Sequence, residues 1–216
     1  MPIPRPRAIL FDWDNTLVDS WATIHQALNT VMAAMGKPLW SLQETKQRVR
    51  LSLRESFPQH FGERWEEARR LYLDTFARIH LDQLTALPGR GELLEQLSGE
   101  NIFLGVVSNK TGALLRRETE RLGWAAFFGR VVGAGDAKWD KPDAAPVTLA
   151  LEPSGIEAGE AVWLVGDTGV DMECARNSGC VPVLLAAGAM EAEFAKCAPR
   201  FTFSDCRALF HFVQGL

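Results

Sequence analysis

This sequence has little of what marks several large classes of protein. Its four cysteines all lie in the last fifth of the 216 residues and form no CxxC pair, so neither a disulfide framework nor a zinc site is expected. Its four histidines have no metal-ligand spacing. Lysine and arginine form no run and the net charge is −4, which argues against the basic surface that nucleic-acid binding needs. We therefore expect a reduced, cytoplasmic protein without a nucleic-acid partner.

Long hydrophobic runs are missing too. The longest, residues 181–190, has ten residues with Pro182 and Gly188 among them, whereas a membrane-spanning helix needs about 20. The first ten residues contain no apolar segment of the kind found in signal peptides. What is present, 47% hydrophobic and 23% charged residues, is typical of a soluble globular protein with no membrane partner.

The apolar residues of the first 86 positions predict one strand followed by helices. Residues 8–11 form a short apolar run typical of a buried parallel strand. In residues 17–86 the apolar positions recur at helical spacing, and a capping box begins at Ser41. Phe57-Pro58 is expected to interrupt a helix, and no strand is expected in this region.

From residue 87 onward, strands are expected to alternate with helices, which predicts a parallel sheet covered on both faces. We expect strands at 102–107, 130–132, 161–165, 181–185 and 201–203, and helices at 91–97, 112–122, 144–151, 170–177 and 208–213. The fold class is therefore α/β, a Rossmann-like parallel sheet flanked by helices on both faces. Its core domain comprises residues 1–16 and 87–216, and residues 17–86 form an inserted α-helical cap domain over the carboxyl ends of the strands.

Polar side chains directly follow four of the expected strands. The carboxyl ends of parallel strands meet at one edge of a sheet, where ligands bind in folds of this kind. We therefore expect these side chains to converge although they lie far apart in the sequence. They are Asp12, Asp14 and Thr16 after the first strand, Ser108, Asn109 and Lys110 after the second, Lys138 and Lys141 after the third, and Asp167 and Asp171 after the fourth.

The chemistry of these residue types indicates phosphoryl transfer. Two carboxylates about 4 Å apart repel by roughly 4 kcal/mol at an effective dielectric constant near 20, so they stay ionised only beside a cation. Hard oxygen ligands select Mg²⁺. An ionised aspartate can attack phosphorus if Mg²⁺, lysine and hydrogen-bond donors offset the repulsion between the two anions. The simpler interpretation of Asp12 and Asp14 is a solvated strand end, with Asp14-Asn15 in an Asx turn.

The same residues resemble the four motifs of the haloacid dehalogenase superfamily, in their order along the chain. The motifs here are Asp12-x-Asp14-x-Thr16, Ser108-Asn109-Lys110, Lys141-Pro142 and Gly166-Asp167-(x)3-Asp171. The resemblance covers nearly the whole chain and is strongest to phosphoglycolate-phosphatase-like hydrolases with a small helical cap. It implies a Mg²⁺-dependent phosphatase that hydrolyses a small phosphorylated metabolite, a phosphate monoester, through an aspartyl-phosphate intermediate.

The resemblance also implies catalytic roles for these side chains. Asp12 would be the nucleophile and Asp14 the general acid and base. Ser108 and Asn109 would bind the transferring phosphoryl group, and Lys141 would steady both the nucleophile and the phosphate. The presence of Asp14 argues against a dehalogenase, since dehalogenases of the superfamily lack the second acid.

For the metal, the resemblance implies a set of aspartates as ligands. Asp12 and Asp167 would bind Mg²⁺ through their carboxylates, and Asp14 through its backbone carbonyl. Asp171 would either support these ligands or bind the metal through a water molecule. Asp19 and Ser20, which follow the first motif, are expected to begin the first cap helix rather than to react.

The sequence departs from the family pattern at two positions. Asn15 stands where glycine is usual, and asparagine tolerates the left-handed backbone conformation that this turn requires. The proline after Lys141-Pro142 falls late, at Pro146, so Lys138 remains a rival to Lys141, although the Lys-Pro pair favours Lys141.

The substrate and the outcome of the reaction stay open. Arg48, Arg50 and Arg54 could recognise a substrate carboxylate or a second phosphate, or they could be solvated surface residues. A phosphomutase would use the same site, and a non-enzymatic phosphoacceptor, similar to a response-regulator receiver, would use the same acidic pocket. An inserted cap argues against the receiver, because a receiver needs an open face for its partner.

Overall fold

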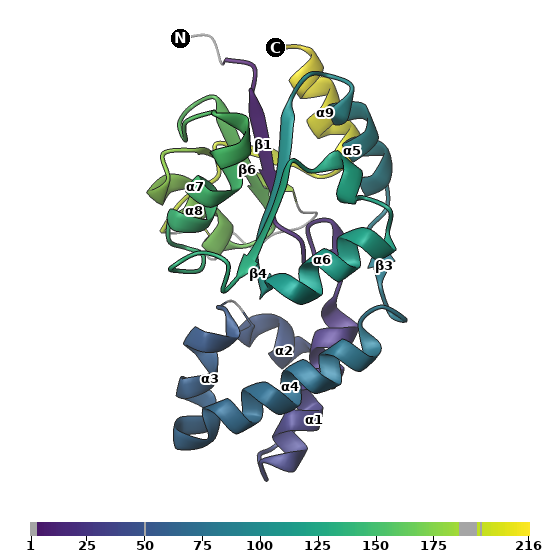
Figure 1. Ribbon diagram of the computed structural model, residues 1–216, viewed down its shortest axis with the longest axis vertical. Coiled ribbons are helices and arrows are strands. Elements are labelled where there is room, and N and C mark those ends of the chain that lie inside the picture. Colours follow the sequence, from purple (N-terminus) through teal and green to yellow (C-terminus); the bar gives the residue numbers. More distant parts are fainter. Residues whose placement is uncertain (1–3, 50, 186–193, 195) are drawn as a thin grey trace.

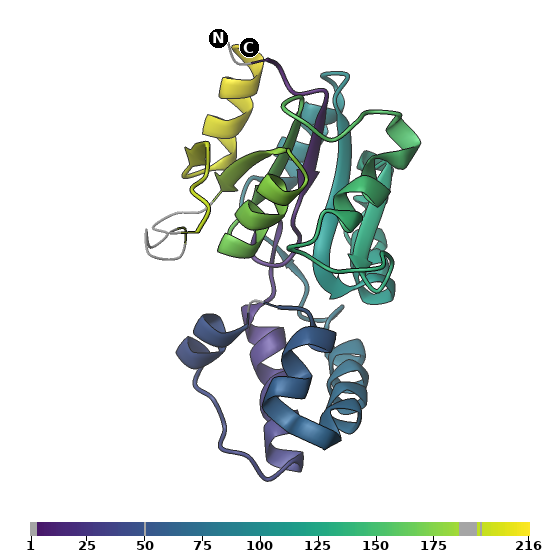
Figure 2. The ribbon, with the colours of Figure 1, turned by 90° about the vertical axis from the view of Figure 1, so that its left-hand side faces the viewer.

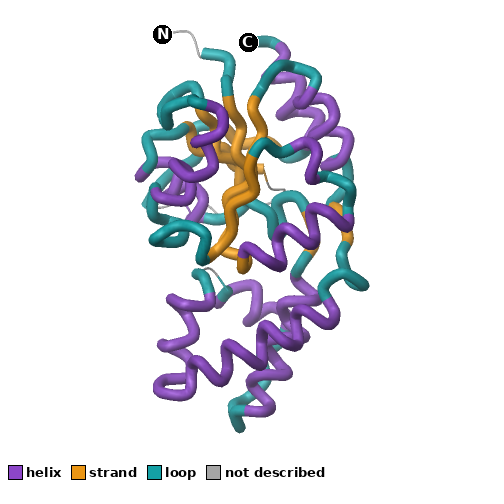
Figure 3. The backbone as a smooth tube through the Cα atoms, in the orientation of Figure 1, coloured by secondary structure: helices purple, strands orange, loops and turns teal. Residues whose placement is uncertain are grey.

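The computed structural model describes residues 4–49, 51–185, 194 and 196–216. Within these ranges a sheet of six parallel strands runs in the order β5-β4-β1-β6-β7-β8 (Figures 1 and 3). The strands are β1 (Ala8–Phe11), β4 (Phe103–Thr111), β5 (Arg130–Ala134), β6 (Val162–Gly166), β7 (Val181–Leu185) and β8 (Phe201–Phe203). Every expected strand is present, and the predicted Rossmann-like sheet is confirmed. The apolar run that began at residue 181 continues past Leu185 into residues outside the described ranges.

Helices cover both faces of the sheet, and strand β1 is therefore buried on both sides. Ile9 and Phe11 pack into one apolar cluster, whereas Ala8 and Leu10 pack into another on the opposite face. Helices α5 and α9 lie on the first face and α7 and α8 on the second (Figure 1). The helices of this part are α5 (Arg90–Ser98), α6 (Gly112–Arg121), α7 (Ala145–Leu151), α8 (Gly169–Asn177) and α9 (Cys206–Gln214), with short 3-10 turns η2 (Ala125–Phe127) and η3 (Glu152–Ser154).

A separate group of helices lies at the carboxyl ends of the strands (Figures 1 and 2). It has its own apolar cluster, in which Ile24, Phe57, Tyr72 and Phe76 are buried. The capping box is present, since Ser41 accepts a hydrogen bond from the backbone N–H of Glu44. The elements are α1 (Trp21–Ala34), α2 (Leu42–Arg48), α3 (Leu53–Phe61), the 3-10 turn η1 (Gly62–Arg64) and α4 (Trp65–Ile79).

The expectation that residues 17–86 contain no strand is wrong. Strand β2 (Val18–Asp19) pairs with β3 (Thr85–Ala86) in an antiparallel register, with Val18 opposite Ala86. These two-residue strands join the chain that leaves the sheet to the chain that returns to it. They are too short to produce a periodic apolar pattern, so their pairing comes from tertiary structure.

Pro58 does not break a helix as expected, but lies inside α3. A proline there forgoes one backbone hydrogen bond. Its neighbour Phe57 and, three residues on, Phe61 are both buried, and the ring of Phe57 lies 5.7 Å from that of Tyr72 on α4. Burial of these rings offsets the lost hydrogen bond and keeps the short helix intact. None of the helices in the described ranges is both long and apolar enough to cross a membrane.

Candidate active site

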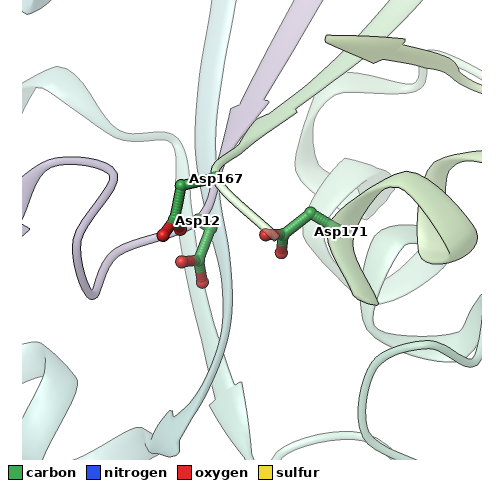
Figure 4. A group of neighbouring side chains, drawn as sticks. All are labelled: Asp12, Asp167 and Asp171. Atoms are coloured by element: carbon green, nitrogen blue, oxygen red, sulfur yellow. The ribbon is translucent and has the colours of Figure 1, made fainter. Parts of the chain in front are cut away.

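Three of the predicted acids meet at the carboxyl edge of the sheet (Figure 4). Asp12 follows β1, Asp167 follows β6, and Asp171 lies in the first turn of α8. One carboxylate oxygen from each lies within 4.8 Å of the other two. The approach needs glycine at position 166, where a Cβ atom would lie only 2.3 Å from Cγ of Asp171. The parallel sheet thus brings together residues that are 159 positions apart in the chain.

Lys141 is the cation of this cluster. Its Nζ lies 2.7 Å from Oδ1 of Asp12 and 2.6 Å from Oδ1 of Asp171, and its side chain is 3% exposed. Lys138 is exposed instead, with its Nζ 5.5 Å from the ring centre of Trp139. The structure therefore places Lys141, and not its rival Lys138, among the acids.

The charges at this edge do not balance. Burial raises the pKa of Asp12 to about 6, and the neighbouring carboxylates of Asp171 and Asp14 add to the rise against the opposing effect of Lys141. Burial and the carboxylates of Asp171 and Asp12 also raise the pKa of Asp167 well above its usual value. Three carboxylates face one lysine, so a cation bound among them would relieve the repulsion. A set of carboxylate oxygens fits a hard divalent ion such as Mg²⁺.

The loop after β1 is held in the conformation that the first motif requires. Asn15 has φ +65°, so the left-handed turn expected of this asparagine is confirmed. The hydroxyl of Thr16 donates to Oδ1 of Asp167 at 2.9 Å, and Thr16 is fully buried. Thr16 therefore links the first and fourth motifs, as a structural residue would.

The side chain of Asp14 lies apart from the three clustered acids. Its Oδ1 accepts a hydrogen bond from the hydroxyl of Ser20 and lies 2.7 Å from Nζ of Lys110. Lys110 is 2.6 Å from Oε2 of Glu118, a residue of α6 that is almost fully buried. Asp14 is thus oriented by a lysine that a second carboxylate holds in place.

This second charged group was not predicted. The sequence indicates Lys110 only as one of the hydrogen-bond donors after its strand, and it indicates no role for Glu118. A glutamate in an amphipathic helix usually faces solvent, and the sequence contains no signal that this one is buried.

Ser108 and Asn109 lie near the end of strand β4 rather than in a loop, because the strand extends to Thr111. Ser108 is buried and lines the pocket above the acids. The amide of Asn109 accepts from the backbone N–H of Lys141 at 3.0 Å and donates to its carbonyl at 3.1 Å. Asn109 thereby fixes the segment that carries Lys141. Direct contact of Ser108 or Asn109 with phosphate stays a prediction.

A pocket of about 120 Å³ opens above the acids, between the sheet and the helices α1, α3 and α4. Two of the three candidate arginines are described, and neither lines this pocket. Arg48 lies 4.9 Å from the ring centre of Trp40 and 3.1 Å from Glu44, whereas Arg54 contacts Asp140 at 2.5 Å. Arg50 lies outside the described residues.

The comparisons with known proteins agree on one family. A family model described as haloacid dehalogenase-like hydrolase matches residues 9–185. The chain is 30% identical over 216 residues to the phosphoglycolate phosphatase of Rhodospirillum rubrum, and this match covers 94% of this chain and 89% of the relative. It is 27% identical over 201 residues to that of Chromobacterium violaceum, with 89% and 90% covered. A haloacid dehalogenase-like protein from Streptococcus pneumoniae shares the fold, with a TM-score of 0.84 at 23% identity over 96% of this chain and 98% of that one.

The chain therefore belongs to the haloacid dehalogenase-like hydrolase family, which confirms the resemblance of its four motifs. It is an enzyme of the hydrolase class, with its acidic cluster at the edge of the sheet where those motifs meet.

Proposed function

We propose that this enzyme is a Mg²⁺-dependent phosphatase that hydrolyses a small organic phosphate monoester through an aspartyl-phosphate on Asp12. The observation that carries the proposal is the position of Asp12, whose carboxylate faces both the pocket and the cluster formed with Asp167, Asp171 and Lys141. The relatives named phosphoglycolate phosphatase support a phosphate ester as substrate.

In the first step, a carboxylate oxygen of Asp12 attacks phosphorus and the bond from phosphorus to the ester oxygen breaks. With a pKa of about 6, Asp12 is mainly ionised at neutral pH and ready to attack. The released alcohol oxygen takes a proton from Asp14, which lies at the same pocket. Lys141 stabilises the negative charge next to the attacking carboxylate.

In the second step, Asp14 takes a proton from a water molecule whose oxygen attacks the phosphorus of the aspartyl-phosphate. The bond between phosphorus and Asp12 breaks, which restores the carboxylate and releases inorganic phosphate. Ser108 and Asn109, near the end of β4, would hold the phosphoryl oxygens during both steps, since they line the same pocket as Asp12.

The residues that would hold Mg²⁺ are Asp12, Asp167 and the backbone carbonyl of Asp14, with Asp171 bound through water or supporting the others. When bound, the ion would offset the charge of the phosphate and of the aspartates. We further propose that residues 17–86 act as a cap domain, because α1, α3 and α4 supply the side of the pocket opposite the acids.

The experiment is a phosphate-release assay on a panel of phosphate monoesters with and without Mg²⁺. Wild-type protein should release phosphate only with the metal, and Asp12→Asn should be inactive, whereas Asp19→Asn, a change at an exposed neighbouring aspartate, should not differ from wild type. Mass spectrometry after acid quenching should find a phosphoryl group on the peptide that contains Asp12.

Three results would contradict the proposal or redirect it. Equal activity of Asp12→Asn and wild type would exclude Asp12 as the nucleophile. Transfer of the phosphoryl group to a second position of a sugar phosphate, without release, would indicate a phosphomutase. Durable labelling of Asp12 by acetyl phosphate without turnover would indicate a phosphoacceptor module.

A further inference from the structure

The pocket above Asp12 has two walls of opposite chemistry. The sheet supplies the polar wall, where Asp12, Ser108 and Lys141 lie. The helical segment and the start of α6 supply the other wall, and its side chains are almost entirely apolar or aromatic. That wall consists of Trp21, Ile24, Val49, Leu51, Leu53, Tyr72, Phe76 and Leu114. A phosphate monoester bound at Asp12 would have its alcohol part against this apolar wall.

The cations that line the pocket are already paired with carboxylates. Among the described lining residues these are Lys110, which contacts Asp14 and Glu118, and Lys141, which contacts Asp12 and Asp171. A second anionic group on the substrate would therefore compete with protein carboxylates for these lysines. Desolvation of such a group against apolar side chains would carry a further cost.

Tyr72 shows the electrostatic character of the apolar wall. Burial, together with the carboxylates of Asp14 and Glu118, raises the pKa of Tyr72, so its hydroxyl stays neutral. The same two carboxylates would repel a carboxylate of the substrate at this position. The ring of Tyr72 packs between those of Phe57 and Phe76, with its centre 5.7 Å from each, so aromatic packing fixes its position in the wall.

The apolar wall continues into a second, smaller cavity inside the helical segment. Ile24, Val49, Leu51, Leu53 and Tyr72 line both cavities. The titratable residues that line the second cavity include His60, whose pKa is lowered by burial and by the charges of Arg48 and Lys37, and Arg48. Arg48 itself is paired with Glu44 and lies over the ring of Trp40.

We propose that the alcohol part of the substrate is an apolar group, aromatic or branched aliphatic, rather than one with a second anionic group. The apolar group would lie against Ile24, Tyr72 and Leu114 and would extend toward the second cavity. This proposal rests on the phosphatase function proposed above and narrows it to one class of phosphate ester. It departs from the carboxylate-bearing ester named for the relatives.

The test compares two esters of primary alcohols, benzyl phosphate and 2-phosphoglycolate, by the kcat/KM of the Mg²⁺-loaded enzyme. Benzyl phosphate should be preferred by about tenfold or more, because apolar contacts discriminate by factors of this order. A lysine placed in the apolar wall should reverse the trend. Leu51→Lys suits this purpose, because Leu51 is 37% exposed and its replacement disturbs no core.

Leu51→Lys should lower kcat/KM for benzyl phosphate and raise it for 2-phosphoglycolate. The matched control is Leu39→Lys, since Leu39 is an exposed leucine of the same segment that lines neither cavity. This control should change neither value. A change in both variants alike would show a general effect of added charge and would overturn the assignment of the wall.

An equal or higher kcat/KM for 2-phosphoglycolate in wild-type protein would overturn the proposal while leaving the phosphatase function intact. If the protein releases phosphate from neither ester and from no other ester in the panel, the apolar-substrate proposal and the phosphatase function are rejected together. The two failures are distinguishable because only the second abolishes Asp12-dependent phosphate release altogether.

Discussion

His80 and Glu118 are in direct contact across the boundary between the helical segment and the sheet. Nδ1 of His80, at the end of α4, lies 2.7 Å from Oε1 of Glu118 on α6, and both side chains are at most 1% exposed. A carboxylate only accepts, so Nδ1 carries the proton. Oε2 of Glu118 also accepts from the indole N–H of Trp13 and from Lys110, each at 2.6 Å. One buried carboxylate thus joins the helical segment, the loop after β1 and the lysine beside Asp14.

Replacement of Glu118 by glutamine should lower the free energy of unfolding by about 3 kcal/mol. The neutral amide leaves the buried charge of Lys110 with a single partner, Asp14, and breaking a buried pair in this way is costly. Urea unfolding followed by circular dichroism measures the change. Glu120→Gln, at an exposed position of the same helix, is the control and should stay within about 0.5 kcal/mol of wild type.

Mg²⁺ should stabilise the protein more at about pH 7.5 than at about pH 5. The pKa of Asp12 is raised to about 6 in the folded protein, so the folded state binds more protons than the unfolded state between about pH 4 and pH 6. Without metal, stability therefore falls as the pH rises through this window, because the buried carboxylate ionises. Mg²⁺ competes with those protons and gains affinity as they leave.

The measurement is the shift in Tm on adding saturating Mg²⁺ at the two pH values. Asp167→Asn should reduce the shift at the higher pH, since it removes one of the three clustered carboxylates. Asp82→Asn, at an exposed aspartate outside the cluster, should not. A shift that is independent of pH would show that Mg²⁺ does not bind the buried acids.

The parts of the site that could be predicted are those that depend on the parallel sheet. Asp12 and Asp167 directly follow strands whose apolar runs are clear, and parallel strands bring such positions together whatever lies between them. Contacts made by helix faces could not be predicted. Nothing in the sequence distinguishes the buried Glu118 from an exposed glutamate, or shows that Pro58 lies inside a helix whose neighbouring rings, Phe57 and Phe61, are buried.

Lys141→Met should lower kcat by about a hundredfold or more, because it removes the one cation in contact with both Asp12 and Asp171 among the described residues. The methionine keeps most of the length of the lysine stem but leaves the carboxylates of Asp12 and Asp171 without this partner, so the variant should be folded but less stable than wild type. Lys138→Met is the matched control, and its kcat should equal that of wild type, since Lys138 is exposed over Trp139. Steady-state phosphate release measures the kcat of both variants, and circular dichroism confirms that each is folded.

Asn15→Ala should reduce both stability and kcat, whereas Asn101→Ala should reduce stability alone. Both asparagines have positive φ, +65° and +56°, where an alanine costs about 1 kcal/mol. Asn101 is exposed at the far end of β4, but Asn15 lies between the two residues Asp14 and Thr16, which the turn aims at Lys110 and Asp167. In Asn15→Ala the turn is expected to rearrange to relieve this strain, and the rearrangement would misplace Asp14, the proposed acid and base.

Asn15→Gly separates the backbone conformation from the side chain. Glycine adopts positive φ freely, although it loses the 3.3 Å contact between the asparagine Oδ1 and the backbone N–H of Ser20, as alanine also does. If the conformation matters, Asn15→Gly keeps a kcat close to that of wild type while Asn15→Ala does not. Equal losses in both variants would assign the effect to the hydrogen bond with Ser20, which in turn contacts Asp14 through its hydroxyl.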